Sequence, residues 1–208
     1  AFDAEAALTL GYANDVLHRT DETVHQALSG IRTLVRSGLP PCSAAARELM
    51  REIDLTSTYL QAIGYVSNGA LVCSSMTGPP VPLGAPAFRT VDGAELYLDV
   101  PVRTTYGHPL LSLERDDYAV LIHRDLPLDI WTNAPGIALA VLHLERGRTS
   151  IQHGHIDPAW LGRLGKQATA VFTDGGYLVT MARSQRFPIA AIATTPIVQL
   201  EKRNRELA

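Results

Sequence analysis

The feature that most constrains how this sequence can fold is a hairpin signal placed between its only two cysteines. Apolar residues flank Asn68-Gly69 in the stretch 59–72, and Asn-Gly favours a tight β-turn because both residues tolerate positive φ. Cys73 follows directly, so we expect it on a strand, whereas Cys42 lies in a proline-rich bend before a helix. An even cysteine count fits a disulfide in an oxidising compartment. The residues by themselves also allow two buried thiols.

Residues 3–37 are predicted to form one long helix. Apolar and small residues recur there in a heptad-like stripe made of Leu10, Leu17, Val24 and Ile31, with Ala13, Thr20, Ala27 and Leu34 between them. The d positions of this heptad carry small residues and a threonine, which would weaken the packing of a coiled coil. The stripe therefore fits a helix packed on its own domain as well as a dimer seam. A homodimer is therefore left open. Gly30 costs about 1 kcal/mol relative to alanine, and we expect a bend or break there.

The rest of the chain predicts a second helix, a loop and a series of short strands. Ser43 is a good N-cap for a helix reaching about Ile53, and four prolines and two glycines make 77–86 a surface loop. Further strands are expected at 95–102, 118–123, 136–144, 170–173, 177–181 and 189–194, a short helix from Asp157, and a helical end over 197–208.

These elements together predict an α+β fold. A long N-terminal helix, a mainly antiparallel central sheet and a C-terminal exit helix suit the PAS/Cache-like sensor folds by analogy. No internal boundary is evident, so we expect one domain over 1–208. Its parts would be the helix 3–37, a hairpin region 42–78 and a sheet region 95–196.

Charge and motifs exclude several classes of function. The net charge is −3 with dispersed lysines and arginines, which argues against a nucleic-acid surface. No apolar run approaches the ~20 residues of a membrane helix. Phosphate-binding glycine loops and a Gly-x-Ser-x-Gly elbow are missing, so nucleotide binding and that hydrolase class have no support.

A few side chains with chemical potential remain, and the simpler interpretation is preferred for each. His153, His155 and Asp157 lie on one stretch, but a metal usually needs ligands from separate elements, so we expect no metal and no other cofactor. Tyr106, His108, Tyr118 and Trp131 are more typical of core than of a ligand pocket. His143 is expected in the core or at a sheet edge. A catalytic Cys73 would need a positioned base, so no catalytic residue is predicted.

The cysteine region resembles a known family. Residues 73–75 read Cys-Ser-Ser, Gly78 follows closely, the Asn-Gly hairpin leads in, and Cys42-Ser43 stands 31 residues before Cys73. Together, the residues from Pro41 to Gly78 resemble the CSS-motif domain, the periplasmic sensor segment of bacterial membrane-bound EAL-type cyclic-di-GMP phosphodiesterases.

The resemblance implies a redox sensor that is not itself an enzyme. Cys42 and Cys73 would form a disulfide that restrains the output and whose reduction releases it, with Ser74 and Ser75 completing the motif and bonding backbone or tuning the thiol. The bridge would be the main restraint on the Pro40-Pro41 bend.

The same resemblance implies partners and a location. The partners would be DsbA-type periplasmic oxidoreductases, flanking transmembrane helices and a cytoplasmic EAL phosphodiesterase domain of the same chain, and the location a periplasmic loop of an inner-membrane protein. The alternatives are a small-molecule-binding sensor with a purely structural disulfide, and a secreted enzyme.

Overall fold

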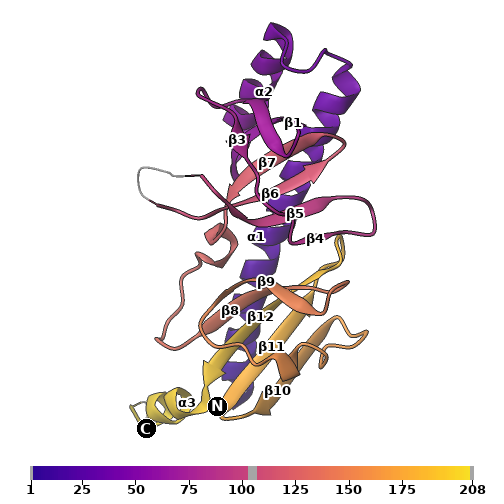
Figure 1. Ribbon diagram of the computed structural model, residues 1–208. Helices are drawn as coiled ribbons and strands as arrows, with labels where there is room; N and C mark the ends of the chain where they lie inside the picture. The colour runs from indigo at the N-terminus through magenta and orange to yellow at the C-terminus, as the bar shows by residue number, and fades with distance from the viewer. Residues whose placement is uncertain (1, 103–106, 207–208) are drawn as a thin grey trace. The chain divides into compact units, whose positions relative to one another are not determined.

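The structure, a computed structural model, describes residues 2–102 and 107–206 (Figure 1). It divides into two compact units, one formed by Glu22–Leu126 and the other by Ala1–Asp21 with Pro127–Ala208. Each unit is built on its own antiparallel sheet. The predicted α+β plan with a long first helix and a helical end is confirmed. The strands form two sheets instead of one central sheet, and the predicted domain 1–208 contains both units.

Helix α1 (Phe2–Ser37) runs through Gly30 without the expected break. A Cβ at Gly30 would lie 3.0 Å from Ile53 Cγ2 and 3.0 Å from Ile63 Cδ1. Glycine therefore serves close packing of the helix, and this contact outweighs its low helix propensity. The expected break at this position is absent for that reason.

The heptad-like stripe of α1 is buried within the chain itself. Six of its eight members are buried: Ala13, Leu17, Thr20, Ala27, Ile31 and Leu34. Side chains already buried in their own units cannot line a dimer seam. The structure thus favours the intramolecular interpretation of the stripe, and a homodimer remains a prediction that would need another surface.

Helix α2 (Ala44–Thr56) begins at the predicted N-cap. The Ser43 hydroxyl accepts a hydrogen bond from the Ala46 amide at 3.1 Å, which satisfies one of the free donors of the first turn. Ala46, Met50 and Ile53 form the buried face. This helix packs on the side of the first sheet that carries Ile63, the side that Gly30 of α1 also contacts.

The first sheet has seven antiparallel strands in the order β3-β2-β1-β7-β6-β5-β4. Their bounds are β1 Leu60–Ser67, β2 Ala70–Ser74, β3 Val81–Pro82, β4 Phe88–Arg89, β5 Glu95–Val100, β6 Leu110–Arg115 and β7 Tyr118–His123. β3 lies in the predicted loop, and its proline is tolerated because the strand is at the sheet edge. The sequence analysis also missed β4 and β6.

On the sheet side away from Ile63, a core cluster gathers residues from five strands and one loop: Ala62, Val66, Leu71, Leu83, Tyr97, Val100, Leu110, Ala119 and Leu121. In β5 the buried residues are Tyr97 and Val100, while Leu96 and Leu98 are only half-buried. A pairing irregularity between Tyr97 and Val100 changes the alternation of β5.

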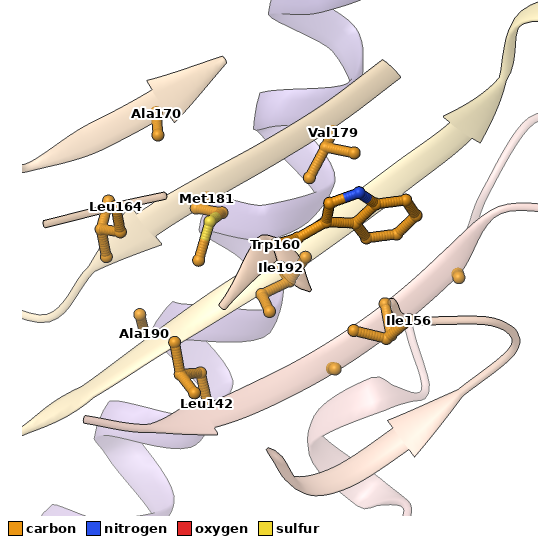
Figure 2. Close-up of a cluster of buried hydrophobic side chains, with 11 residues drawn as sticks. Leu142, Ile156, Trp160, Leu164, Ala170, Val179, Met181, Ala190 and Ile192 are labelled. Atoms are coloured by element: carbon orange, nitrogen blue, oxygen red, sulfur yellow. The ribbon is translucent and has the colours of Figure 1, made fainter. Parts of the chain in front are cut away.

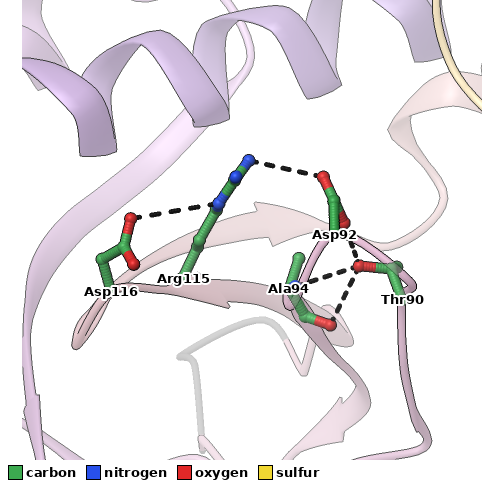
Figure 3. A network of polar contacts seen from close by, with 5 residues as sticks. All are labelled: Thr90, Asp92, Ala94, Arg115 and Asp116. Carbon is green, nitrogen blue, oxygen red and sulfur yellow. Dashed lines mark hydrogen bonds and ion pairs between the residues drawn. The ribbon is translucent and has the colours of Figure 1, made fainter.

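Two turns of this sheet are joined by an exposed polar network (Figure 3). The β4–β5 turn is closed by Thr90, whose hydroxyl accepts from the Ala94 amide at 2.9 Å and also bonds Asp92. Arg115 Nη1 lies 3.3 Å from Asp92 Oδ2, and Arg115 Nε lies 3.9 Å from Asp116 Oδ2. Ion pairs this exposed add at most about 1 kcal/mol, so the network orients the turns more than it stabilises them.

The second sheet has five antiparallel strands in the order β10-β11-β12-β8-β9. The bounds of this unit's elements are β8 Ala138–His143, β9 Arg148–His153, η2 Pro158–Trp160, β10 Thr169–Asp174, β11 Tyr177–Arg183, β12 Ile189–Pro196 and α3 Ile197–Glu206, with η1 Leu126–Leu128 at the unit boundary. Trp160 lies over β11 and β12 near Val179 and Ile192 (Figure 2). Its indole nitrogen donates to Asp174 at 2.8 Å, which satisfies its polar atom.

The start of α1 is tied to the end of this unit. The hydroxyls of Thr9 and Thr195 lie 2.9 Å apart, and Arg203 Nη2 lies 2.9 Å from Glu5 Oε2. The first link joins α1 to β12, and the second joins α1 to α3. Within the described residues, no helix combines the length and apolar character that crossing a bilayer requires.

Candidate functional site

Cys42 and Cys73 are joined by a disulfide in the first unit. Their sulfurs lie 2.01 Å apart and their Cα atoms 5.7 Å apart. Cys42 lies in the turn between α1 and α2, and Cys73 is the fourth residue of β2. The bond therefore fastens the helical turn to a strand of the sheet.

A β-bulge determines which way Cys73 faces. Tyr65 pairs with Cys73 while Val66 pairs with Leu71, so β2 carries one additional residue, Val72. Neighbouring residues of a strand face opposite sides, so Cys73 lies on the Tyr65 side and Leu71 on the Val66 side. Without the bulge, Cys73 and Leu71 would share the side away from α2.

Gly64 is a site residue that the sequence analysis did not single out. It pairs with Ser74, and a Cβ at this position would lie 2.2 Å from the carbonyl oxygen of Cys73 and 2.7 Å from the Cβ of Ser74. Only glycine allows β1 to approach the motif this closely. An isolated glycine in an apolar strand pattern is the sequence signal that indicates such an approach.

The two serines of the motif bond backbone at the end of β2. The Ser75 hydroxyl accepts from the Ile63 amide at 3.1 Å, and the Ser75 amide donates to the Ile63 carbonyl at 2.9 Å. The Ser74 hydroxyl accepts from the Met76 amide at 3.1 Å in an exposed turn. Ser75 therefore extends the β1–β2 ladder beyond the strand, and Ser74 shapes the turn that follows.

The Cys42 turn has hydrogen bonds besides the disulfide. The Ser43 amide donates to the Pro40 carbonyl at 3.2 Å, and Arg47 Nε donates to the Cys42 carbonyl at 3.2 Å. Cys42 itself has φ +61°, a region that side-chain-bearing residues rarely adopt. The turn therefore has restraints besides the disulfide, and the expectation that the bridge is its main restraint stays a prediction.

Tyr65, opposite Cys73, packs against Tyr118 of β7 with ring centroids 5.5 Å apart. Burial raises the pKa of Tyr118, and Tyr65 and Asp117 add to the effect. This supports the core interpretation of Tyr118. His108 is exposed beside His123, Trp131 is 80% exposed, and Tyr106 lies outside the described residues.

The histidine pair of the second unit is exposed. His153 ends β9, and the ring of His155 lies 5.8 Å from both Trp160 and Tyr177. Asp157 accepts from the Ala159 amide at 2.9 Å as the N-cap of η2. Over the described residues, no three His, Cys, Asp or Glu side chains lie together as a metal site would require. The metal-free expectation remains a prediction.

Solved structures share this fold at low sequence identity. The extracellular domain of rpHK1S-Z16 aligns with a TM-score of 0.54 at 16% identity, over 92% of this chain and 92% of that chain. An extracellular ligand binding receptor from Desulfohalobium retbaense aligns with a TM-score of 0.54 at 14% identity, over 90% of this chain and 39% of that one. The sensory domain of the Campylobacter jejuni chemoreceptor Tlp3 with isoleucine bound gives 0.49 at 13% identity, over 94% of both chains.

The chain therefore has an α+β, Cache-like fold, here with an internal disulfide between a helical turn and a bulged strand. The chain belongs to the family of CSS motif domains associated with EAL, whose model matches residues 6–208. No curated protein matches the sequence significantly.

Proposed function

We propose that this chain is the periplasmic redox-sensing domain of a membrane-bound cyclic-di-GMP phosphodiesterase. The observation that carries the proposal is the Cys42–Cys73 disulfide, which connects the α1–α2 turn to the motif strand. The family's association with EAL supports the link to cyclic-di-GMP hydrolysis. Likeness to the extracellular domain of rpHK1S-Z16 supports a position outside the cytoplasm.

The restraint would act through α1. The turn that contains Cys42 follows the last residue of α1, and the second half of this helix packs on Ile53 of α2 and Ile63 of β1 through Gly30. The oxidised bridge holds the turn against β2 and so favours one docking of α1. Reduction removes that restraint, and the freed helix passes the change to a membrane helix preceding it.

The remaining parts of the system follow from the same proposal. DsbA-type oxidoreductases would set the state of the two cysteines in the periplasm, where disulfides persist. The output would be the EAL domain of the same chain, with membrane helices flanking the sensor. This segment carries no catalysis in the scheme.

The test compares full-length protein in membranes with a Cys42→Ser/Cys73→Ser double variant. Reductant should raise hydrolysis of cyclic-di-GMP by the wild type about fivefold or more. A change of this size is usual for the coupling between two sites of one protein. The double variant should match the reduced wild type and ignore reductant. Equal hydrolysis by oxidised and reduced wild type would contradict the redox proposal.

A second candidate is a small-molecule sensor whose disulfide is purely structural. The fold likeness to an extracellular ligand binding receptor favours it. In that case reduction would lower the melting temperature of the chain and leave hydrolysis unchanged, and a ligand would alter hydrolysis in either redox state.

A further inference from the structure

We propose that thiol exchange at this disulfide takes place on the sulfur of Cys42, and that Cys73 is always the leaving and the buried partner. This inference rests on the proposed redox function and names its regulatory partner by chemistry: a dithiol oxidoreductase that docks on the α1–α2 turn. The two cysteines thus have unequal roles.

The two cysteines differ in how accessible they are to an attacking thiolate. Cys42 is partly exposed, and Pro40, Pro41, Ala44 and Ala45 around it are exposed. Cys73 is only 5% exposed and faces the side of the sheet on which α2 packs. An attacking thiolate must approach along the axis of the S–S bond, from behind the sulfur it attacks. Approach to Cys42 comes from the open turn, whereas approach to Cys73 requires displacing strand or helix.

Charge favours the same direction of approach. The turn precedes the first residues of α2, whose N-terminal end is positive, and the Arg47 guanidinium is fixed to the Cys42 carbonyl at 3.2 Å. These features attract an incoming thiolate to the turn. They also favour Cys42 as the departing thiolate, which would direct attack to Cys73. Burial of Cys73 decides between the two effects, because exchange requires access to the attacked sulfur.

Reduction of the bridge takes place in two exchange steps. The partner's thiolate forms a new S–S bond to Cys42 Sγ, the Cys42–Cys73 bond breaks, and its electron pair leaves with Cys73 Sγ, which takes a proton from water. The partner's second thiol then attacks its own sulfur in the mixed disulfide and releases Cys42 as a thiol. Two electrons pass from the partner dithiol to this chain, and the partner becomes a disulfide.

The first test traps the mixed disulfide. The oxidised 208-residue chain is mixed with a thioredoxin-type Cys-x-x-Cys reductase whose second cysteine is changed to serine, and in parallel with glutathione. Free thiols are alkylated, and peptides are assigned by mass spectrometry. We expect adducts on Cys42 to exceed those on Cys73 by about tenfold or more, since access controls the site of attack.

The second test uses the reduced chain under native conditions. A short pulse of iodoacetamide should modify Cys42 about tenfold faster than Cys73, because a buried thiol is inert. The difference should vanish in denaturant. In the oxidised chain, an Arg47→Gln variant should slow glutathione attack on Cys42, whereas Arg51→Gln, at an exposed position of the same helix, should not.

Adducts mainly on Cys73, equal adducts on both cysteines, or no adduct with either reagent would overturn this inference. None of these readouts measures cyclic-di-GMP hydrolysis. If attack is selective for Cys42 and hydrolysis does not respond to reductant, the proposed function fails while the exchange site stands.

Discussion

The hydroxyls of Ser74 and Ser75 differ in what their loss would expose. Ser75 accepts the amide proton of Ile63, a residue that is fully buried. Ser74 bonds the Met76 amide in an exposed turn, where water can replace it. The two neighbouring serines therefore contribute unequally to folding, although the sequence presents them as equivalent.

We expect Ser75→Ala to lower the free energy of unfolding by about 1–3 kcal/mol, because it leaves a buried amide without an acceptor. Ser74→Ala should change it by less than about 0.5 kcal/mol, as surface substitutions usually do. Denaturant unfolding of the oxidised chain would measure both. Equal losses in the two variants would contradict this assignment.

His143 makes the stability of the second unit depend on pH. Burial lowers its pKa, Arg146 and Arg148 act in the same direction, and Glu145 opposes them. The unfolded chain therefore binds the proton at higher pH than the folded chain. The stability that His143 contributes is fully present above its unfolded-state pKa of about 6.5. It is lost as the pH falls toward the folded-state pKa.

Protonation of His143 should lower the free energy of unfolding by up to about 1.4 kcal/mol per pH unit below pH 6.5. A His143→Gln variant should show a correspondingly flatter decline, measured as the free energy of unfolding against pH. A wild-type slope in His143→Gln would rule out this residue as the cause.

At the scale of elements, the motif depends on how closely β1 and β2 approach. The bulge at Val72 turns Cys73 toward α2, and Gly64 leaves room for the backbone at Cys73 and Ser74. The disulfide therefore needs a strand pair with an irregular register as well as two cysteines.

Gly64→Ala tests this close approach. We expect it to destabilise the oxidised chain by about 1–3 kcal/mol, because a methyl group would overlap a backbone carbonyl that cannot move without the strand. Gly11→Ala is the matched control, since nothing lies within 4 Å of a Cβ there. It should stabilise α1 by up to about 1 kcal/mol. Unfolding curves showing no loss in Gly64→Ala would refute the steric explanation.

At the scale of the whole molecule, the question is how far the effect of reduction spreads. The bridge closes a loop between positions 31 apart, which the chain-entropy model values at about 3–4 kcal/mol. The Ser43 cap and the Arg47 bond do not involve either sulfur atom, so we expect both to remain after reduction. The first unit should therefore loosen without unfolding.

Hydrogen exchange on the oxidised and reduced chain measures this spread. Faster exchange should concentrate at about 28–53, because these residues flank the released turn. Strands β8 and β12 belong to the other unit and should change little. Identical exchange in both forms throughout would mean that the disulfide is a passive staple.

The pairing of the two cysteines was implied by the family resemblance. Local patterns in the sequence determined the first helix, the Ser43 cap, the Asn68-Gly69 turn and most of the interior strands. Each depends on neighbours within a few residues, where propensity and hydrophobic period are decisive. Only the tertiary structure decided that α1 stays continuous at Gly30, that the strands form two sheets, and that β3, β4, β6 and β9 exist. It also decided that a bulge turns Cys73 toward α2 and that Cys42 is partly exposed in its own turn. These outcomes depend on contacts between residues distant in sequence, where packing and strand register override local preference.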